Sequence, residues 1–299
     1  MKNRTTPGSV VFAVINYTAF ILFTILCILP FYYIFINTIS ANDLASTGRI
    51  LLIPKGIHLS NYLKVLQLKG LPLASLVTLA RTVLGTVLSV YCSAFVAFAI
   101  TRQELWHRKF VYRFFIVTMY FNAGLIPWFI TMKMLHLTNN FLVYIIGVIA
   151  PFNMILVKTY IENTPSSLQE SAEIDGAGYL TVFARIVLPI CTPILATVAV
   201  FTAVGQWNSW TDTLFLMTDS RLFTLQFLLY QYLNQATALA NMMRTASGSG
   251  QVVIPPTQIL TPTAIKMTIA MVVTLPVLFV YPFFQRYFVK GIMIGAVKG

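Results

Sequence analysis

Six long apolar stretches, separated by shorter polar segments, dominate the pattern of the chain. They cover residues 10–36, 73–100, 111–132, 138–157, 187–207 and 263–284. A helix needs about 20 predominantly apolar residues to cross the hydrocarbon core of a bilayer, and each stretch is long enough. The fourth is the shortest and contains Pro151, which neighbouring helices can accommodate. The pattern therefore predicts an all-α integral membrane protein with six transmembrane helices.

The distribution of Lys and Arg indicates the orientation of these helices. With a cytoplasmic N-terminus, eleven of the 20 basic residues fall in inner segments, seven in the longer outer segments and two inside spans. Cytoplasmic loops carry an excess of Lys and Arg, so both termini are expected in the cytoplasm. The expected divisions are an N-terminal tail (1–9), a first helix with its outer loop (10–72), a five-helix core (73–284) and a C-terminal tail (285–299). The core contains an inner loop at 158–186 and an outer loop at 208–262.

Composition supports this class and excludes others. Of the 299 residues, 58% are hydrophobic and only 9% are charged, whereas soluble domains carry about 25% charged residues. The net charge of +12 is spread over loops and termini and forms no basic face of the kind that binds nucleic acid. The three cysteines and three histidines are scattered, without metal-ligand spacing. We therefore expect neither a nucleic-acid site nor a metal site.

The inner loop at 158–186 is unusually acidic. It holds four of the eight acidic residues of the chain: Glu162, Glu170, Glu173 and Asp175. Its pattern predicts a short helix, a sharp turn and a second short helix. Two starts fit the first helix: Thr164 as N-cap with Pro165 in the first turn, or Ser167 as N-cap with Glu170 at capping-box spacing.

The two short helices of this loop are expected to be amphipathic. In the first, an apolar side toward the membrane surface is formed by Leu168, Ala172 and Ile174. In the second, three residues share a face at helical spacing: Leu180, Phe183 and Ile186. Gly176 lies between the helices, where a positive φ angle costs glycine little. Spacing alone leaves two interpretations open, an interfacial hairpin with solvated charges and a docking element.

The same loop resembles the signature loop of the permease subunits of bacterial ATP-binding-cassette (ABC) importers. That signature reads Glu-Ala-Ala-x3-Gly-x9-Ile-x-Leu-Pro. Here Glu170-Ser171-Ala172 is followed after three residues by Gly176, and after nine more by Ile186-x-Leu188-Pro189. The one departure is Ser171, where a small serine replaces the alanine of the signature. Six matched positions at fixed spacing make this a specific signal.

Two further stretches resemble the smaller, maltose-type permease of carbohydrate importers. One is the C-terminal segment 285–291 with the final residues 295–299, and the other includes Phe223-Thr224-Leu225 and the Tyr230 to Asn234 segment. The likeness runs from about residue 10 to the end. Within that group the sequence is most similar to the branch that serves oligosaccharides and polysaccharide fragments.

The resemblance implies a type I ABC importer permease fold with a cytoplasmic coupling helix that sits in a cleft of the ATPase. The residues implied in ATPase coupling are Glu170, Ser171, Ala172, Asp175, Gly176, Ile186, Leu188 and Pro189. The implied partners are a second permease, two copies of a cytoplasmic ABC ATPase, an extracytoplasmic binding protein and an oligosaccharide, in a bacterial cell membrane. The chain has no GxxxxGK[ST] phosphate loop, so ATP and Mg are expected on the partner and no cofactor on this chain. It is therefore expected to be a non-catalytic pore subunit.

Two polar segments have roles that the resemblance implies. The tail residues Gly295, Ala296, Val297, Lys298 and Gly299 are implied to contact the ATPase, although chain ends commonly fray. The outer-loop residues Ser247, Gly248, Ser249, Gly250 and Gln251 are implied to contact the binding protein. A passive, flexible linker is the alternative for that loop.

Other functional classes fit the sequence less well. A secondary transporter or channel usually needs an acidic residue inside a span, and none of the six spans has one. A membrane-bound enzyme would need a cluster of catalytic residues, which the chain does not offer. Import of a non-sugar solute by the same ATP-driven machinery remains an alternative.

Three cations lie toward the outer side of the predicted spans: Arg81, Lys133 and Lys266. Long basic side chains commonly extend their charges to the membrane interface, which explains Lys133 and Lys266 better than Arg81. The alternative is that they line the substrate path and attract an acidic oligosaccharide. Arg81 leads this hypothesis because a guanidinium matches a carboxylate bidentately.

Overall fold

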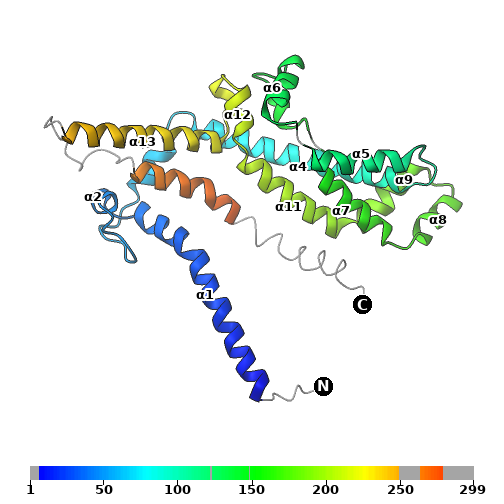
Figure 1. Cartoon of the computed structure of the whole chain (residues 1–299), viewed down its shortest axis with the longest axis horizontal. Helices are drawn as coiled ribbons and strands as arrows, with labels where there is room; N and C mark the ends of the chain where they lie inside the picture. Colours follow the sequence, from blue (N-terminus) through cyan, green and yellow to red (C-terminus); the bar gives the residue numbers. More distant parts are fainter. Residues whose placement is uncertain (1–6, 122, 148, 249–262, 279–299) are drawn as a thin grey trace. The chain divides into compact units, whose positions relative to one another are not determined.

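The computed structural model describes residues 7–121, 123–147, 149–248 and 263–278. The chain divides into two compact units, whose helices are labelled in Figure 1. The first unit comprises Met1–Leu68 and Gln231–Leu275, and the second comprises Lys69–Tyr230 and Pro276–Gly299. The described residues contain helices and no strand, so the predicted all-α class is confirmed.

The first unit contains the N-terminal helix α1, Pro7–Thr38, which is apolar along its length and exposed except at its C-terminal end. The short helices α2 (Asn42–Ser46) and α3 (Ser60–Leu66) follow. Asn61 on α3 ties the end of α1 to α2, because its amide donates to the Thr38 carbonyl at 3.0 Å and to Asn42 Oδ1 at 2.8 Å. Residues 263–275 of the helix at Thr263–Leu278 and most of α13 (Leu225–Gly248) complete the described part of this unit.

The second unit is built on the long helix α4, Leu71–Thr101. Helices α7 (Pro151–Glu162) and α11 (Thr192–Asn208) pack along it (Figure 1). The face of α4 that they cover is rich in small residues: Gly85, Ser89, Ser93, Ala94 and Ala97. Small side chains let helix backbones approach closely, which is how helices associate in lipid. The main apolar core lies at this three-helix contact.

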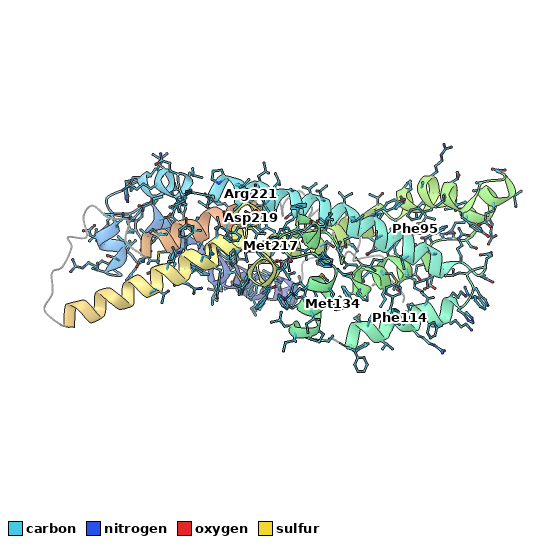
Figure 2. The ribbon with its side chains drawn as sticks, turned by 90° about the horizontal axis from the view of Figure 1, so that it is seen from above. Phe95, Phe114, Met134, Met217, Asp219 and Arg221 are labelled. Atoms are coloured by element: carbon cyan, nitrogen blue, oxygen red, sulfur yellow. The ribbon has the colours of Figure 1, made fainter. Side chains whose placement is uncertain are left out.

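The remaining helices of the second unit are short. They are α5 (Arg108–Tyr120), α6 (Leu125–Met134), η1 (Phe141–Tyr144), α8 (Ser167–Ile174), α9 (Tyr179–Val182), η2 (Phe183–Val187), α10 (Leu188–Ile190), α12 (Thr211–Leu216) and η3 (Ser220–Leu222). A second, smaller apolar cluster contains Tyr144 and Leu216 and packs against α6. Figure 2 shows the side chains of these helices from above.

Three expected spans are not single straight helices. Within 187–207, α10 and α11 are separate helices. Within 111–132, α5 and α6 form a bend of 120°, and Gly124, with a φ of +84°, precedes α6. Within 138–157, the 3-10 helix η1 is followed by α7, which begins at Pro151. Proline lacks the N–H that a helix interior needs and is tolerated in a first turn. Pro151 therefore starts a helix rather than interrupting one.

Two described helices, α1 and α4, are long and apolar enough to cross a membrane. Two pairs of bent helices add two candidates if each pair is counted as one span. One pair is α5 and α6, and the other joins Tyr179–Ile190 to Thr192–Asn208 with a bend of 80°. The helix at Thr263–Leu278 is apolar but shorter. The total of six spans and the cytoplasmic placement of both termini remain predictions.

Candidate functional site: the coupling loop and a buried ion pair

Helix α8 forms the first half of the acidic inner loop. It begins at Ser167 with Ser166 as N-cap, and the Ser166 side chain makes no capping bond. Neither expected start is therefore correct, since the cap lies between the two predicted residues, Thr164 and Ser167. Glu170 falls in the first turn, where a negative charge interacts favourably with the helix dipole.

Gly176 forms the sharp turn that ends α8. Its φ is +83°, which confirms the positive angle expected from the sequence. Its N–H donates to the Glu173 carbonyl at 3.0 Å, and the Ala177 N–H donates to the Ala172 carbonyl at 2.9 Å. A Cβ at Gly176 would meet no atom within 4 Å. The requirement for glycine is therefore conformational and does not arise from crowding.

Arg102 anchors this loop to the end of α4. Its Nη1 donates to Glu173 Oε1 at 2.6 Å and its Nη2 donates to Gln169 Oε1 at 2.7 Å. The guanidinium also lies 4.5 Å from the ring centroid of Phe98 and 5.7 Å from that of Tyr179. Sequence reasoning treated Arg102 only as one of the cations that orient the membrane helices. In the structure it fixes α8 relative to α4.

The second half of the loop is held by the aromatic side chain of Phe183, on η2. The buried Phe183 ring contacts three rings of α4, with centroid distances of 5.8 Å to Tyr91, 5.4 Å to Phe95 and 5.3 Å to Phe98. Val182 and Val187 are buried beside it. Aromatic pairs at such distances add to the stabilisation from burial, so η2 is firmly packed against α4.

The apolar faces expected for the two short helices are only partly found. Ala172 packs against the main core, and Phe183 is buried. Ile174 and Leu180, however, are 86% and 68% exposed. The core covers one side of each helix only, because the helices are one or two turns long and their other sides point away from α4 and α7.

The inner loop at 158–186 is called the coupling loop below, after the role that the family resemblance implies. Its exposed side is both acidic and apolar. Glu170 is exposed and makes no ion pair with any described residue. It shares this surface with Ile174, Asp175 and Leu180, all exposed. A carboxylate without a partner, beside exposed apolar side chains, suits contact with a protein that supplies basic or backbone donors.

A buried ion pair lies at the other end of α4. The Arg81 side chain, 3% exposed, donates from Nη2 to Asp212 Oδ2 at 2.6 Å and from Nη1 to Asp212 Oδ1 at 3.1 Å. Nε and Nη2 both donate to Gln206 Oε1, at 3.1 and 3.0 Å. Nη1 also reaches the Ser209 carbonyl at 3.4 Å, and the guanidinium lies 4.4 Å from the Tyr144 ring centroid. The pair joins α4, the end of α11 and α12.

Hydroxyl groups extend this polar network. Tyr144 Oη donates to the Leu222 carbonyl at 2.7 Å and lies 2.9 Å from Thr213 Oγ1. Thr213 Oγ1 lies 3.0 Å from Thr224 Oγ1. The Leu225 N–H donates to Thr78 Oγ1 at 2.7 Å, which returns the network to α4. Buried polar groups that are fully paired in this way make a packing arrangement specific and rigid.

Gly85, one turn after Arg81, makes room for this network. A Cβ on Gly85 would come within 2.8 Å of Gln206 Nε2, so a larger residue would displace the Gln206 side chain. Sequence reasoning missed both Asp212 and Gln206 as partners of Arg81. Asp212 lies outside the predicted spans, and no local pattern connects it to Arg81.

An exposed ion pair near this network provides a contrast. Asp219 and Arg221 lie close together on and beside η3 (Figure 2), and Arg221 Nη2 is 2.8 Å from Asp219 Oδ2. The hydrogen bonds that the Arg221 side chain donates hold the pKa of the Asp219 carboxyl below its usual range. The side-chain bonds between the two residues stay within the 219–221 segment, whereas the Asp219 backbone N–H donates to Asn139 Oδ1 at 3.0 Å.

The structure does not bring the other predicted site residues together. Lys133 is exposed in the last turn of α6, and Lys266 is exposed on the helix at Thr263–Leu278. Ser247 and Gly248 end α13, while residues 249–251 and the tail at 295–299 lie outside the described residues. The described part of the chain contains no group of His, Cys, Asp and Glu that would hold a metal ion.

Comparison with known proteins defines the class of protein to which these features belong. No family model matches the chain. It is 34% identical to the Polygalacturonan/rhamnogalacturonan transport system permease protein YtcP of Bacillus subtilis (strain 168) over the full length of both chains. It is 33% identical to Protein LplC of the same organism, covering 91% of this chain and 90% of that one.

A solved structure agrees with these relatives. A chain of a bacterial ABC transporter involved in the import of the acidic polysaccharide alginate superimposes with a TM-score of 0.82. The match covers 95% of this chain and 99% of the other, at 28% identity. The fold and the coupling loop thus define an ABC importer permease. The protein belongs to the family of permease subunits of bacterial ABC carbohydrate importers, which are cell-membrane proteins.

Proposed function

We propose that this chain forms one half of the pore of an ATP-driven importer of acidic oligosaccharides. The observation that carries the proposal is the coupling loop, in which Arg102 fixes α8 to α4 while Glu170 is exposed and forms no ion pair within the described part of the chain. A docking helix that transmits force must be rigid toward its own subunit and open toward the partner. In this proposal a second permease completes the pore, two cytoplasmic ABC ATPases bind and hydrolyse ATP with Mg, and an extracytoplasmic protein delivers the sugar.

Helices α4 and α11 supply the route by which ATPase motion reaches the outer side of the pore. Both run from the coupling loop to the buried ion pair, since α4 contains Arg81 and has Arg102 as its C-cap, and α11 leads from the end of the loop to Ser209. At 1.5 Å per residue, Arg81 and Arg102 lie about 30 Å apart along α4. A displacement of α8 therefore moves two helices whose far ends the Arg81–Asp212 pair holds together. This provides a physical basis for alternating access.

The proposed topology is six spans with both termini in the cytoplasm, which places the coupling loop on the cytoplasmic face. In this arrangement the tail at 295–299 contacts the ATPase. The outer segment at 247–251 contacts the binding protein. Both roles rest on the family resemblance of those segments.

The acidic nature of the substrate is proposed from the relatives. One relative is named for polygalacturonan and rhamnogalacturonan, and the structural neighbour serves alginate, an acidic polysaccharide. The net charge of +12 favours the approach of anions by long-range attraction. Arg81 itself is buried and paired in this structure, whereas the other two cations suggested for the path, Lys133 and Lys266, are exposed.

A matched pair of sugars tests the substrate class. Uptake is measured in cells that carry this chain with its partner subunits, using trigalacturonic acid and α-1,4-linked galactotriose, in which hydroxymethyl groups replace the carboxylates. We expect the acidic sugar to be preferred by at least about tenfold, the equivalent of about 1.4 kcal/mol. Equal uptake of both, or preference for the neutral sugar, contradicts the acidic assignment while leaving the importer role intact.

A further inference from the structure

The connection between α4 and α5 forms a basic pocket that the coupling mechanism does not use. The cavity has a volume of about 410 Å3 and is open to the surface. Its lining residues, named here as the basic pocket, are Gln103, Leu105, His107, Arg108, Lys109, Phe110 and Arg113. Three of the seven carry a permanent positive charge, and none is acidic.

The cations of the basic pocket have no anionic partner in the described part of the chain. Arg108, Lys109 and Arg113 take part in none of the ion pairs formed there. All three lie in the first two turns of α5, whose first turn contains no acidic residue. Positive charge near a helix N-terminus is unfavourable because it opposes the helix dipole. An anion in the pocket would offset both the mutual repulsion of the cations and this interaction.

The basic pocket lies at the same end of the helix bundle as the coupling loop. Arg102, adjacent to the pocket, bonds to Glu173 on α8. Lys158 on α7, which leads into the loop, lies 4.3 Å from the Tyr112 ring centroid on α5. If the coupling loop meets a cytoplasmic ATPase, as proposed above, this end faces the inner leaflet of the membrane.

An exposed apolar stripe runs along α5 from the basic pocket. Phe110, Phe114 and Val117 are 69%, 56% and 51% exposed and are spaced four and three residues apart, so they share one face of the helix. Figure 2 marks Phe114 on this helix. Trp106, just before α5, is 83% exposed, and Trp is enriched at membrane interfaces. The segment therefore combines an interfacial anchor, a row of cations and an apolar stripe that suits an acyl chain.

We propose that the basic pocket binds the headgroup of an anionic phospholipid, with an acyl chain along the Phe110, Phe114 and Val117 stripe. Basic pockets on the cytoplasmic side of membrane proteins bind anionic headgroups in this way. Placement in the inner leaflet rests on the proposed function, whereas binding itself does not. Because the α4–α5 connection is attached through Arg102 to α8, the lipid stabilises the end of α4 to which the coupling loop is anchored.

Native mass spectrometry of the purified transporter complex tests the proposal with phosphatidylglycerol and phosphatidylcholine as probes. The variant is Arg108→Gln/Lys109→Gln/Arg113→Gln. The matched control is Lys55→Gln/Lys64→Gln/Lys69→Gln, which removes the same charge at three exposed positions outside the pocket. We expect phosphatidylglycerol affinity to fall by roughly fivefold per cation removed in the pocket variant and to be unchanged in the control, with phosphatidylcholine weak throughout.

Several results would overturn the proposal. Retention of phosphatidylglycerol by the pocket variant, or equal loss in the control, rules out a localised lipid site. Displacement of the lipid by excess inorganic phosphate indicates a site for free phosphate instead. Loss of the ATPase subunit from the pocket variant, with lipid binding unchanged, assigns the surface to a protein contact. If the triple variant does not fold, the single changes Arg113→Gln and Lys69→Gln serve the same comparison.

This test remains independent of the transport proposal. Bound phospholipid is counted directly, so the result stands whether or not the complex imports a sugar. If the transport proposal fails and the lipid result holds, the pocket is a lipid site on a permease of another role.

Discussion

Replacing Arg81 by Gln should strongly destabilise the protein and reduce uptake of acidic and neutral sugars alike. The change leaves the Asp212 carboxylate, whose side chain is 14% exposed, without its cation. Removing one partner of a buried ion pair costs about 3–5 kcal/mol. The reverse change, Asp212→Asn, should have a similar effect. Thermal unfolding of the purified protein and uptake of a charged and a neutral trisaccharide provide the measurements.

The double variant Arg81→Gln/Asp212→Asn isolates the interaction between the two charges. Since neither charge is then left buried alone, its cost should be clearly smaller than the sum of the two single changes. The exposed pair is the matched control, and Arg221→Gln should leave unfolding temperature and uptake close to wild type. Selective loss of the acidic sugar in Arg81→Gln, with normal stability, would instead make Arg81 a substrate-binding residue.

Replacing Gly176 by Pro should abolish uptake while the membrane helices still form. Proline holds φ near −65°, whereas Gly176 has a φ of +83°, and proline also removes the N–H that bonds to the Glu173 carbonyl. Since the proline ring cannot reach a positive φ, the turn itself must rearrange and the docking conformation is lost. Uptake, protein level in the membrane and copurification of the ATPase are the quantities to measure.

Gly178 offers a matched control in the same loop. It has a φ of −71°, and a Cβ there would meet no atom within 4 Å, so Gly178→Ala should transport normally. Glu170→Ala removes a carboxylate without altering the backbone, and we expect weaker ATPase binding with a loss of stability of no more than about 1 kcal/mol. Normal uptake by Gly176→Pro would show that the bend does not transmit force.

The coupling loop could be predicted because the residues that define it are close together in the sequence. The positions of Glu170 and Gly176 follow from a motif of 20 residues, and the structure confirms the turn at Gly176. The anchoring of the loop by Arg102 could not be predicted, because its partner Glu173 lies 71 residues further along the chain. No short-range pattern records a contact of this kind.

The helices, too, were predicted where a continuous apolar run forms one helix, and not where the run is divided. The apolar runs correctly predicted α1 and α4, whose lengths of 32 and 31 residues exceed what a membrane requires. Hydropathy did not reveal the bend between α5 and α6 or the late start of α7, since an apolar run looks the same whether it forms one helix or two. Gly124 and Pro151 mark both positions, and they were the signals available in the sequence.

The partner of Arg81 could not be found by searching the predicted spans alone. Asp212 is separated from Arg81 by 131 residues and lies beyond the predicted end of the fifth span. An arginine buried in a membrane protein requires a partner. That physical requirement, applied to the acidic residues just beyond the outer ends of the spans, would have left Asp43 and Asp212 as candidates.

The central claim is that this chain moves sugar only when a partner ATPase drives it through the coupling loop. The most direct measurement is sugar uptake into proteoliposomes, comparing the assembled complex plus binding protein and ATP with this chain alone under a proton or sodium gradient. We expect uptake only with the complex and ATP, and none by the chain alone. Gradient-driven uptake by this chain without the ATPase would contradict it.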